Sequence, residues 1–187
     1  MIYFVCAFKA EARPFIDRLR LSRTQERPLI YRGDDAILIV GGMGAKAAAD
    51  ATRTVMELRP PAEEDLLVNL GICAAPARFA VGTLLAPASL RCGPEEMPLP
   101  SLRKTTLPRI ALRTVDRPCD EPAETAVDME AFAVAETAAA FFPEERIAVL
   151  KIVSDHFEPD SVTPKLAERL IEKQAENILK HLRFMLH

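Results

Sequence analysis

"IYFVCAF", residues 2–8, is the stretch from which the fold of this chain can be worked out. It is a short, continuous apolar run rich in β-forming residues, which predicts a buried strand. The segment 11–21 follows with helical spacing, and places Phe15 and Leu19 on one face. A buried strand that leads directly into an amphipathic helix predicts the first unit of a layered α/β fold.

The same alternation continues along the rest of the chain. Apolar runs predict further strands at 29–33, 36–42, 65–72, 81–90, 109–115 and 146–155. The first two form a hairpin around Gly33, and the strand at 81–90 has a break at Pro87. Helical spacing predicts helices at 45–60, at 126–142 and from Thr163 onward, the last with core positions at Leu166, Leu170, Ile171, Ile178 and Leu182. We therefore expect a single α/β domain over residues 1–187 with a central sheet.

Composition narrows the class of protein. The 187 residues are 49% hydrophobic and 27% charged, which is ordinary for a globular domain, and the net charge of −3 argues against nucleic-acid binding. No apolar run is long enough to cross a bilayer, and no secretory leader is recognised, so no membrane partner is expected. The four cysteines are far apart and form no CxxC pair. They are interpreted as free thiols in a reducing compartment, the cytoplasm, rather than as zinc ligands.

A proline-rich region interrupts the regular pattern. Seven of the 15 prolines lie between Pro87 and Pro122, with several arginines among them. Too little chain follows this region to form a second core, so it is interpreted as a loop-rich excursion within the domain. It is either an ordinary surface loop or a lid or oligomer contact of a functional site.

A glycine-rich turn, "VGGMGAKAAAD" at 40–50, lies between a predicted strand and a predicted helix. Its residues 42–47 fit the loose dinucleotide pattern GxGxxA, but the acidic residue expected at the end of the next strand is replaced by Asn69. Two other readings remain open. The amides of the turn can face a sugar or an anion, or the glycines can serve the backbone alone.

Three carboxylates stand where strands end or helices begin. Asp155 ends the strand in "KIVSDHFEPD", Glu11 follows the first strand, and Glu130 opens the predicted helix at 126–142. If the strands are parallel neighbours, these groups converge on one pocket. Alone, Glu11 is explained by the helix dipole and Asp155 by a turn. His156, Glu158 and Asp160 lack metal-ligand spacing and are interpreted as a solvated loop.

Five segments, in this order, carry a resemblance to a known family: "AFKAEARPF", "VGGMGA", "VNLGICAAP", "AVDMEAFAVA" and "KIVSD". They resemble the nucleoside phosphorylase superfamily, most closely its methylthioadenosine/S-adenosylhomocysteine nucleosidases. The resemblance implies a three-layer α/β fold with a central mixed β-sheet flanked by helices. It also implies cleavage of a purine–ribose N-glycosidic bond without metal or cofactor. The expected partners are a small-molecule nucleoside and further copies of the chain, as a homodimer or higher homo-oligomer.

The resemblance also implies roles for individual residues. Asp155 matches the general acid that protonates the purine, oriented by Ser154, and Glu11 matches the base that activates water. Met129 packs on the ribose and Glu130 accepts bonds from its hydroxyls, while Asp128 is expected to cap the helix. The remaining expected substrate contacts come from the glycine turns and the following strand: Gly42, Gly44, Gly71, Ile72 and Cys73.

The sequence is also compatible with a phosphorylase or with a non-catalytic nucleoside-binding protein. A phosphorylase needs cationic groups for phosphate, and Asn69 stands near the place of its arginine, which favours water, although Arg13 lies close to Glu11. The segment 90–127 is shorter than in the resembled family, and its purine-stacking aromatic residue is not evident around Pro118 and Cys119. The base and the 5' substituent are therefore open, and a non-catalytic nucleoside-binding relative is the other class.

Overall fold

The computed structural model describes residues 1–102 and 105–186. Its described strands are β1 (Ile2–Cys6), β2 (Ser22–Glu26), β3 (Leu29–Arg32), β4 (Ala36–Val40), β5 (Leu66–Ala74), β6 (Leu84–Leu85), β7 (Ser89–Cys92), β8 (Glu95–Pro98), β9 (Ala111–Thr114), β10 (Ala126–Asp128) and β11 (Ile147–Asp155). The helices are α1 (Lys9–Arg18), α2 (Ala45–Leu58), α3 (Ala131–Ala138) and α4 (Pro164–Leu186).

All these strands belong to one mixed sheet. The strand order is β2-β3-β4-β1-β5-β10-β9-β7-β8. Strand β11 also pairs with β5 and carries β6 on its other side, so these two strands branch from the main order. The central strands β4, β1, β5 and β11 are parallel to one another, whereas β2, β3 and β4 form an antiparallel meander. Since the central strands are parallel, their carboxyl ends meet at one edge of the sheet.

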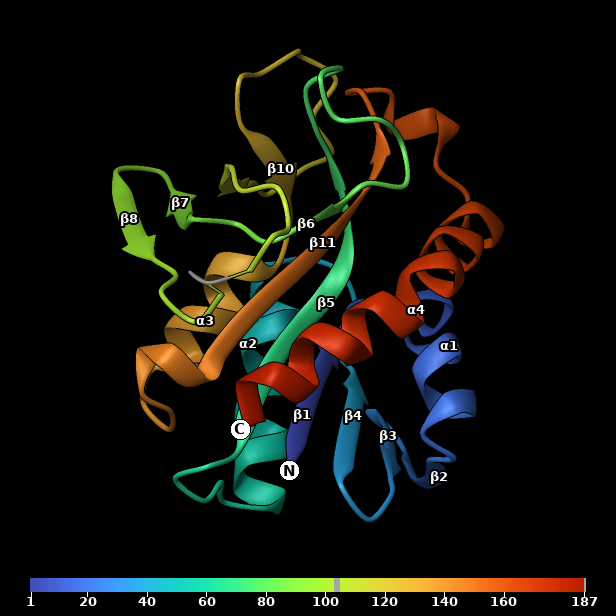
Figure 1. Cartoon of the computed structure of the whole chain (residues 1–187), viewed down its shortest axis with the longest axis vertical. Helices are drawn as coiled ribbons and strands as arrows, with labels where there is room; N and C mark the ends of the chain where they lie inside the picture. Colours follow the sequence, from blue (N-terminus) through green and yellow to red (C-terminus); the bar gives the residue numbers. More distant parts are fainter. Residues whose placement is uncertain (103–104, 187) are drawn as a thin grey trace.

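Helices cover both faces of the sheet (Figure 1), α1 and α4 on one face and α2 and α3 on the other. The alternation of β1 explains how one strand serves both cores. Tyr3 and Val5 face the α2–α3 core, and Ile2, Phe4 and Cys6 face the α1–α4 core. A parallel strand buried on both faces has to be apolar throughout, as the segment 2–8 is. The predicted three-layer fold is confirmed.

The predicted helix at 126–142 is wrong at its start. Residues 126–128 form strand β10, which pairs with β9 in parallel, and α3 spans Ala131–Ala138 only. The N-cap residue of α3 is Glu130 and not Asp128, which was expected there. The Asp128 carboxylate nevertheless accepts a hydrogen bond from the amide of Ala131, the first residue of α3, at 2.8 Å. Strand pairing thus overrides the helical pattern of these residues, since tertiary contacts outweigh local propensity.

The segment 81–90 is interrupted around Pro87, as predicted. It forms β6, which pairs with β11, and β7, which pairs with β8 and β9. The strands β2 and β8 were not predicted, because their sequences are polar and lie at the two edges of the sheet. The proline-rich region contributes β7, β8 and β9 to the same sheet.

Candidate active site

A cavity of about 480 Å³ lies at the carboxyl ends of the parallel strands. Cavities of this size hold small organic ligands. It is lined by residues from every segment that leaves the sheet at this edge: Phe8, Lys9, Ala10, Glu11, Met43, Ile72, Cys73, Ala74, Val115, Pro118, Cys119, Val127, Asp128, Met129, Glu130, Ser154, Asp155, Pro159, Val162, Thr163, Pro164 and Ala167.

Glu11 forms part of the cavity floor and is held by backbone amides. Its Oε2 accepts from the amides of Ala7 and Phe8, each at 3.0 Å, and its Oε1 accepts from the amide of Ile72 at 3.1 Å. A carboxylate offers about four lone-pair sites. Three are used by amides, so one remains for a ligand or water. Burial raises the pKa of Glu11, and the nearby Lys151 ammonium and these amides oppose that effect.

Glu130 is placed by the start of α3 and fixed across the cavity by the glycine turn. Its Oε1 accepts from the amide of Gly44 at 2.8 Å, a contact between residues 86 positions apart. Gly44 has a φ of 92°, which favours glycine there. Burial raises the pKa of Glu130, against the effect of Lys151 and of the Gly44 amide. Met129 precedes Glu130 and lines the same cavity.

Asp155 ends β11, beside a register shift between Val153 and Asp155. Its Oδ2 accepts from the amide of Glu158 at 2.9 Å, and its Oδ1 makes a short contact with the hydroxyl of Ser154. That hydroxyl also lies 3.0 Å from the carbonyl of Cys73. A hydroxyl has one proton, so Ser154 donates to only one of these oxygens at a time. When it donates to the Cys73 carbonyl, its own oxygen is free to accept a hydrogen bond.

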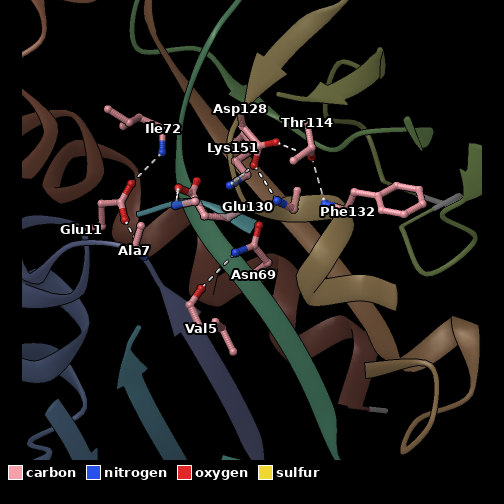
Figure 2. A network of polar contacts seen from close by, with 12 residues as sticks. Val5, Ala7, Glu11, Asn69, Ile72, Thr114, Asp128, Glu130, Phe132 and Lys151 are labelled. Carbon is pink, nitrogen blue, oxygen red and sulfur yellow. Dashed lines mark hydrogen bonds and ion pairs between the residues drawn. The ribbon is translucent and has the colours of Figure 1, made fainter. Parts of the chain in front are cut away.

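A buried ion pair joins Asp128 of the cavity wall to Lys151, which is not a lining residue. The ammonium of Lys151 is 2.8 Å from Oδ2 of Asp128, and the two side chains are 2% and 1% exposed. Asp128 also accepts from the hydroxyl of Thr114 at 2.7 Å, and Thr114 accepts from the amide of Phe132. Figure 2 shows this network joining β9, β10, α3 and β11 next to Glu130. It fixes the peptide that carries Met129 and Glu130.

One end of the cavity is apolar. Its walls there are Val115, Pro118 and Cys119, which leave strand β9, together with Val127 and Ala74. No Phe, Tyr or Trp of this segment is among the described lining residues, so the purine-stacking aromatic residue remains without a counterpart there. The Cys119 thiol accepts from the guanidinium of Arg113 at 3.8 Å and donates to the carbonyl of Glu121.

The structure brings most of the predicted site residues together. Seven of them line the cavity: Glu11, Ile72, Cys73, Met129, Glu130, Ser154 and Asp155. Gly44 and Gly71 lie behind these residues, Gly44 bonded to Glu130 and Gly71 directly against Glu11. Gly42 has a φ of 97° and its position faces Ala47, so it shapes the turn and is not a lining residue.

Four residues that were not assigned to the site from the sequence lie outside the cavity wall: Arg13, His156, Glu158 and Asp160. Glu158 and Asp160 are not among the lining residues, and the His156 ring bonds the carbonyl of Ala75 at 2.9 Å. Within residues 1–102 and 105–186, no group of three or more His, Cys, Asp or Glu side chains could hold a metal ion. Arg13 is paired with Asp17 at 2.7 Å and does not line the cavity.

Sequence reasoning missed several wall residues and the central cation. Phe8, Met43 and Pro164 give no local signal, because they only acquire a role where loops from distant elements meet. Lys151 did give a signal, since a lysine in the middle of an apolar strand has to find a buried partner. Pairing it with Asp128 requires knowing that β11 and β10 lie on either side of β5.

The four described α-helices all begin at this cavity. Its walls include the first residues of α1, the Met43 turn before α2, the cap residue of α3, and Thr163 and Pro164 at the start of α4. The positive ends of four helix dipoles therefore face one space.

No protein-family model and no curated protein sequence matches the chain. Solved structures match its fold. A 5'-methylthioadenosine/S-adenosylhomocysteine nucleosidase from S. pneumoniae, solved with a transition-state inhibitor, gives a TM-score of 0.80 at 16% identity over 97% of each chain. The enzyme from Colwellia psychrerythraea, in complex with adenine, gives 0.78 at 17% identity, over 97% of this chain and 95% of that chain.

A futalosine hydrolase from Helicobacter pylori is a further match, with a TM-score of 0.74 at 16% identity over 99% of this chain and 96% of that one. The chain thus has the fold of these hydrolases along almost its whole length. No described helix is long and apolar enough to span a membrane.

Proposed function

We propose that this protein hydrolyses the N-glycosidic bond of a purine ribonucleoside, of the methylthioadenosine or S-adenosylhomocysteine kind. One observation carries the proposal: Asp155, Glu130 with Met129, and Glu11 line a single cavity at the strand ends. The motif resemblance and the shared fold support it. A site for glycoside hydrolysis needs an acid, a base and a group that stabilises a cationic sugar.

In the proposed reaction a water oxygen bonds to the anomeric carbon of the ribose while the bond from that carbon to the base nitrogen breaks. Glu11 takes a proton from the water, and Asp155 gives its proton to the departing base. The products are the free base and the free sugar. Glu11 suits this role because it lines the cavity, because the three amides leave one of its lone pairs unused, and because burial raises its pKa.

Asp155 has to enter this reaction protonated. The Ser154 hydroxyl, when it donates to the Cys73 carbonyl, accepts a hydrogen bond from the protonated carboxyl group of Asp155. The Glu158 amide holds the other oxygen. Glu130 is assigned to the ribose hydroxyls and to the positive charge that develops on the sugar, and Met129 to packing on the ribose.

Water rather than phosphate is the proposed nucleophile. Phosphate binding relies on charge-assisted bonds, usually from arginine. Lys9 is the single Lys or Arg among the described lining residues, while Ile72 and Cys73 present apolar surface. Arg13 is occupied by Asp17. We expect the protein to act in the cytoplasm as a homodimer or higher homo-oligomer.

The test is base release, followed by chromatography, from a nucleoside panel that includes methylthioadenosine, S-adenosylhomocysteine, adenosine, inosine and futalosine, with and without phosphate. Phosphate-independent release is expected from at least one compound. Asp155→Asn and Glu130→Gln should each lower kcat by at least about 100-fold, because each removes a group that acts in the transition state.

Glu136→Gln is the matched control, since Glu136 is an exposed glutamate on α3, and it should leave kcat unchanged. Circular dichroism checks that every variant is folded. Strict dependence on phosphate would move the protein to the phosphorylases. Stabilisation by a nucleoside without release of any base would leave a binding protein instead of an enzyme.

A further inference from the structure

The buried Lys151 ammonium has no part in the proposed bond-breaking steps, yet it lies beside Asp128 and Glu130 of the cavity wall. Its side chain is 2% exposed in the middle of β11, where a cation without partners would be strongly unfavourable. Asp128 provides the direct partner at 2.8 Å. A single ion pair would satisfy the lysine, but two further carboxylates lie close to it (Figure 2).

Gly71 brings Glu11 next to this lysine. Gly71 is the register partner of Lys151 on the neighbouring strand β5. A Cβ atom at Gly71 would lie 2.7 Å from Oε1 of Glu11 and 3.4 Å from Nζ of Lys151. Both charged groups therefore border the small space that the missing side chain leaves.

The charges around Lys151 are unbalanced. Facing it are the carboxylates of Glu11 from α1, Asp128 from β10 and Glu130 from the start of α3. The thiols of Cys6 on β1 and Cys73 on β5 also face it, and burial raises the pKa of both, so they remain neutral. Three buried acids thus share one buried base, with Asp155 as a further acid beside Cys73.

The directions of the pKa shifts agree with this arrangement. Burial raises the pKa of Glu11 and of Glu130, and Lys151 is the strongest influence that opposes it in each case. Burial by itself would lower the pKa of Lys151, but Asp128, Glu130 and Glu11 outweigh it, so that the pKa is raised and the lysine stays charged. Asp128 acts on Glu130 in the opposite sense to Lys151, by like-charge repulsion.

We propose that Lys151 is a positioning residue whose charge keeps Glu11 and Glu130 ionised inside the cavity, and that Asp128 anchors Lys151 and limits this effect. The inference deepens the proposed function and rests on it, because the water-activating role of Glu11 requires the ionised form. It assigns opposite effects to the two partners of one ion pair, which mere structural damage would not produce.

The first test is the pH dependence of kcat/KM for base release. Lys151→Met should move the acidic limb to higher pH by about one unit or more, since a nearby opposite charge shifts a pKa by about that amount. Asp128→Asn should move the limb to lower pH, and Lys151→Arg, which keeps the charge, should leave it near that of the wild type. Equal shifts in both variants, or none, would overturn the proposal.

An exposed ion pair provides the matched control. Lys46 and Asp50 on α2 are also 2.8 Å apart, but their side chains are 91% and 54% exposed. Lys46→Met and Asp50→Asn should leave the limb in place, because solvent screens surface pairs. If Lys151→Met does not fold, the other two variants still test the proposal. It requires that the acidic limb move to lower pH in Asp128→Asn and stay in place in Lys151→Arg.

The second test is independent of activity. Glutamate carboxyl carbons of the ligand-free protein are titrated by ¹³C NMR, and Glu11→Gln and Glu130→Gln identify the two resonances. Their midpoints should rise in Lys151→Met, and that of Glu130 should fall in Asp128→Asn. These shifts without any base release would contradict the proposed function alone. Base release without the shifts would contradict the role of Lys151 alone.

Discussion

Glu11 shows how tightly one residue of this site is determined. Three backbone amides from two segments hold its carboxylate, and the backbone of Gly71 packs against its Oε1. The side chain cannot rotate away without losing these bonds. A Cβ at residue 71 would collide with the carboxylate in this position, so the position requires glycine there. The site thus depends on a residue that does not line the cavity.

Gly71→Ala should therefore impair the site more than the fold. Its Cβ would lie 2.7 Å from Oε1 of Glu11 and push the carboxylate out of line. We expect kcat/KM to fall by about 100-fold, the typical effect of a displacement near 1 Å. Unfolding in urea should show a loss of about 1–3 kcal/mol, as for other overpacked cores.

Gly33→Ala is the control for this substitution. Gly33 lies in the hairpin that joins β3 and β4, and a Cβ there would approach Cδ2 of Leu21 at 2.8 Å, a similarly short distance. That contact, however, is the end of a flexible side chain. Activity should be unchanged. An active Gly71→Ala enzyme would show that Glu11 is not required where the structure places it.

Among the elements, α2 lies unusually close to the sheet. The Cβ that Gly41 lacks would lie only 2.5 Å from Cβ of Ala51 and 3.3 Å from the carbonyl of Ala47. Small residues on both sides thus let the helix approach the end of β4. The same approach sets the position of the turn whose Gly44 amide bonds Glu130.

Gly41→Ala should push α2 away from the sheet and destabilise the protein by about 1–3 kcal/mol, since neither backbone can yield locally. Ala51→Gly removes the opposing methyl group and costs about 1 kcal/mol in helix propensity. In a double-mutant cycle measured by urea unfolding, the double variant should lose less stability than the sum of the single variants. Strict additivity would show that the two positions do not touch.

The elements that the sequence predicts well are those with their own pattern. β1, β5 and β11 are apolar runs, α2 and α4 have helical periodicity, and all five were found near their observed bounds. The start of the 126–142 segment was not, because alanine and valine there fit a helix as well as a strand. Its strand exists only because β9 lies beside it.

The candidate site divides in the same way. Glu11, Glu130 and Asp155 were predicted because each stands where a strand ends or a helix begins. Parallel topology brings Glu11 and Asp155 together, whereas Glu130 follows β10, which runs antiparallel to β5. The Asp128–Lys151 pair was not, since it depends on how β10 and β11 lie around β5. The apolar end of the cavity depends on the path of the proline-rich region, which has no periodic pattern.

At the scale of the whole molecule, two buried carboxylates of the site lower the free energy of unfolding once they are ionised. The two cores bury apolar side chains on both faces of the sheet, while the cavity at its edge keeps Glu11 and Glu130 in surroundings that raise their pKa values. A group whose pKa is raised on folding contributes stability below its unfolded pKa. This contribution is lost as the pH rises through the folded pKa.

This sign leads to a prediction for Glu130. Its unfolded pKa is about 4.5, so the wild type should lose unfolding free energy relative to Glu130→Gln as the pH rises from about 4.5 through the higher folded pKa. Each unit by which the pKa is raised corresponds to about 1.4 kcal/mol. Urea unfolding of both proteins between pH 4 and 8 measures the difference, and Glu136→Gln should run parallel to the wild type. A difference that is constant or grows with pH would contradict the raised pKa.

The cavity at which all four helices begin has a consequence for how such a protein can change. Part of its wall comes from strand ends, such as Ile72–Ala74 and Ser154–Asp155, and part from connections, such as Met43, Val115, Pro118 and Cys119. Insertions, deletions and exchanges in those connections can therefore alter which ligand fits without repacking the interior. The sheet and its helices can thus be conserved while ligand specificity changes. The proline-rich segment is one place where the sequence can change specificity without changing this fold.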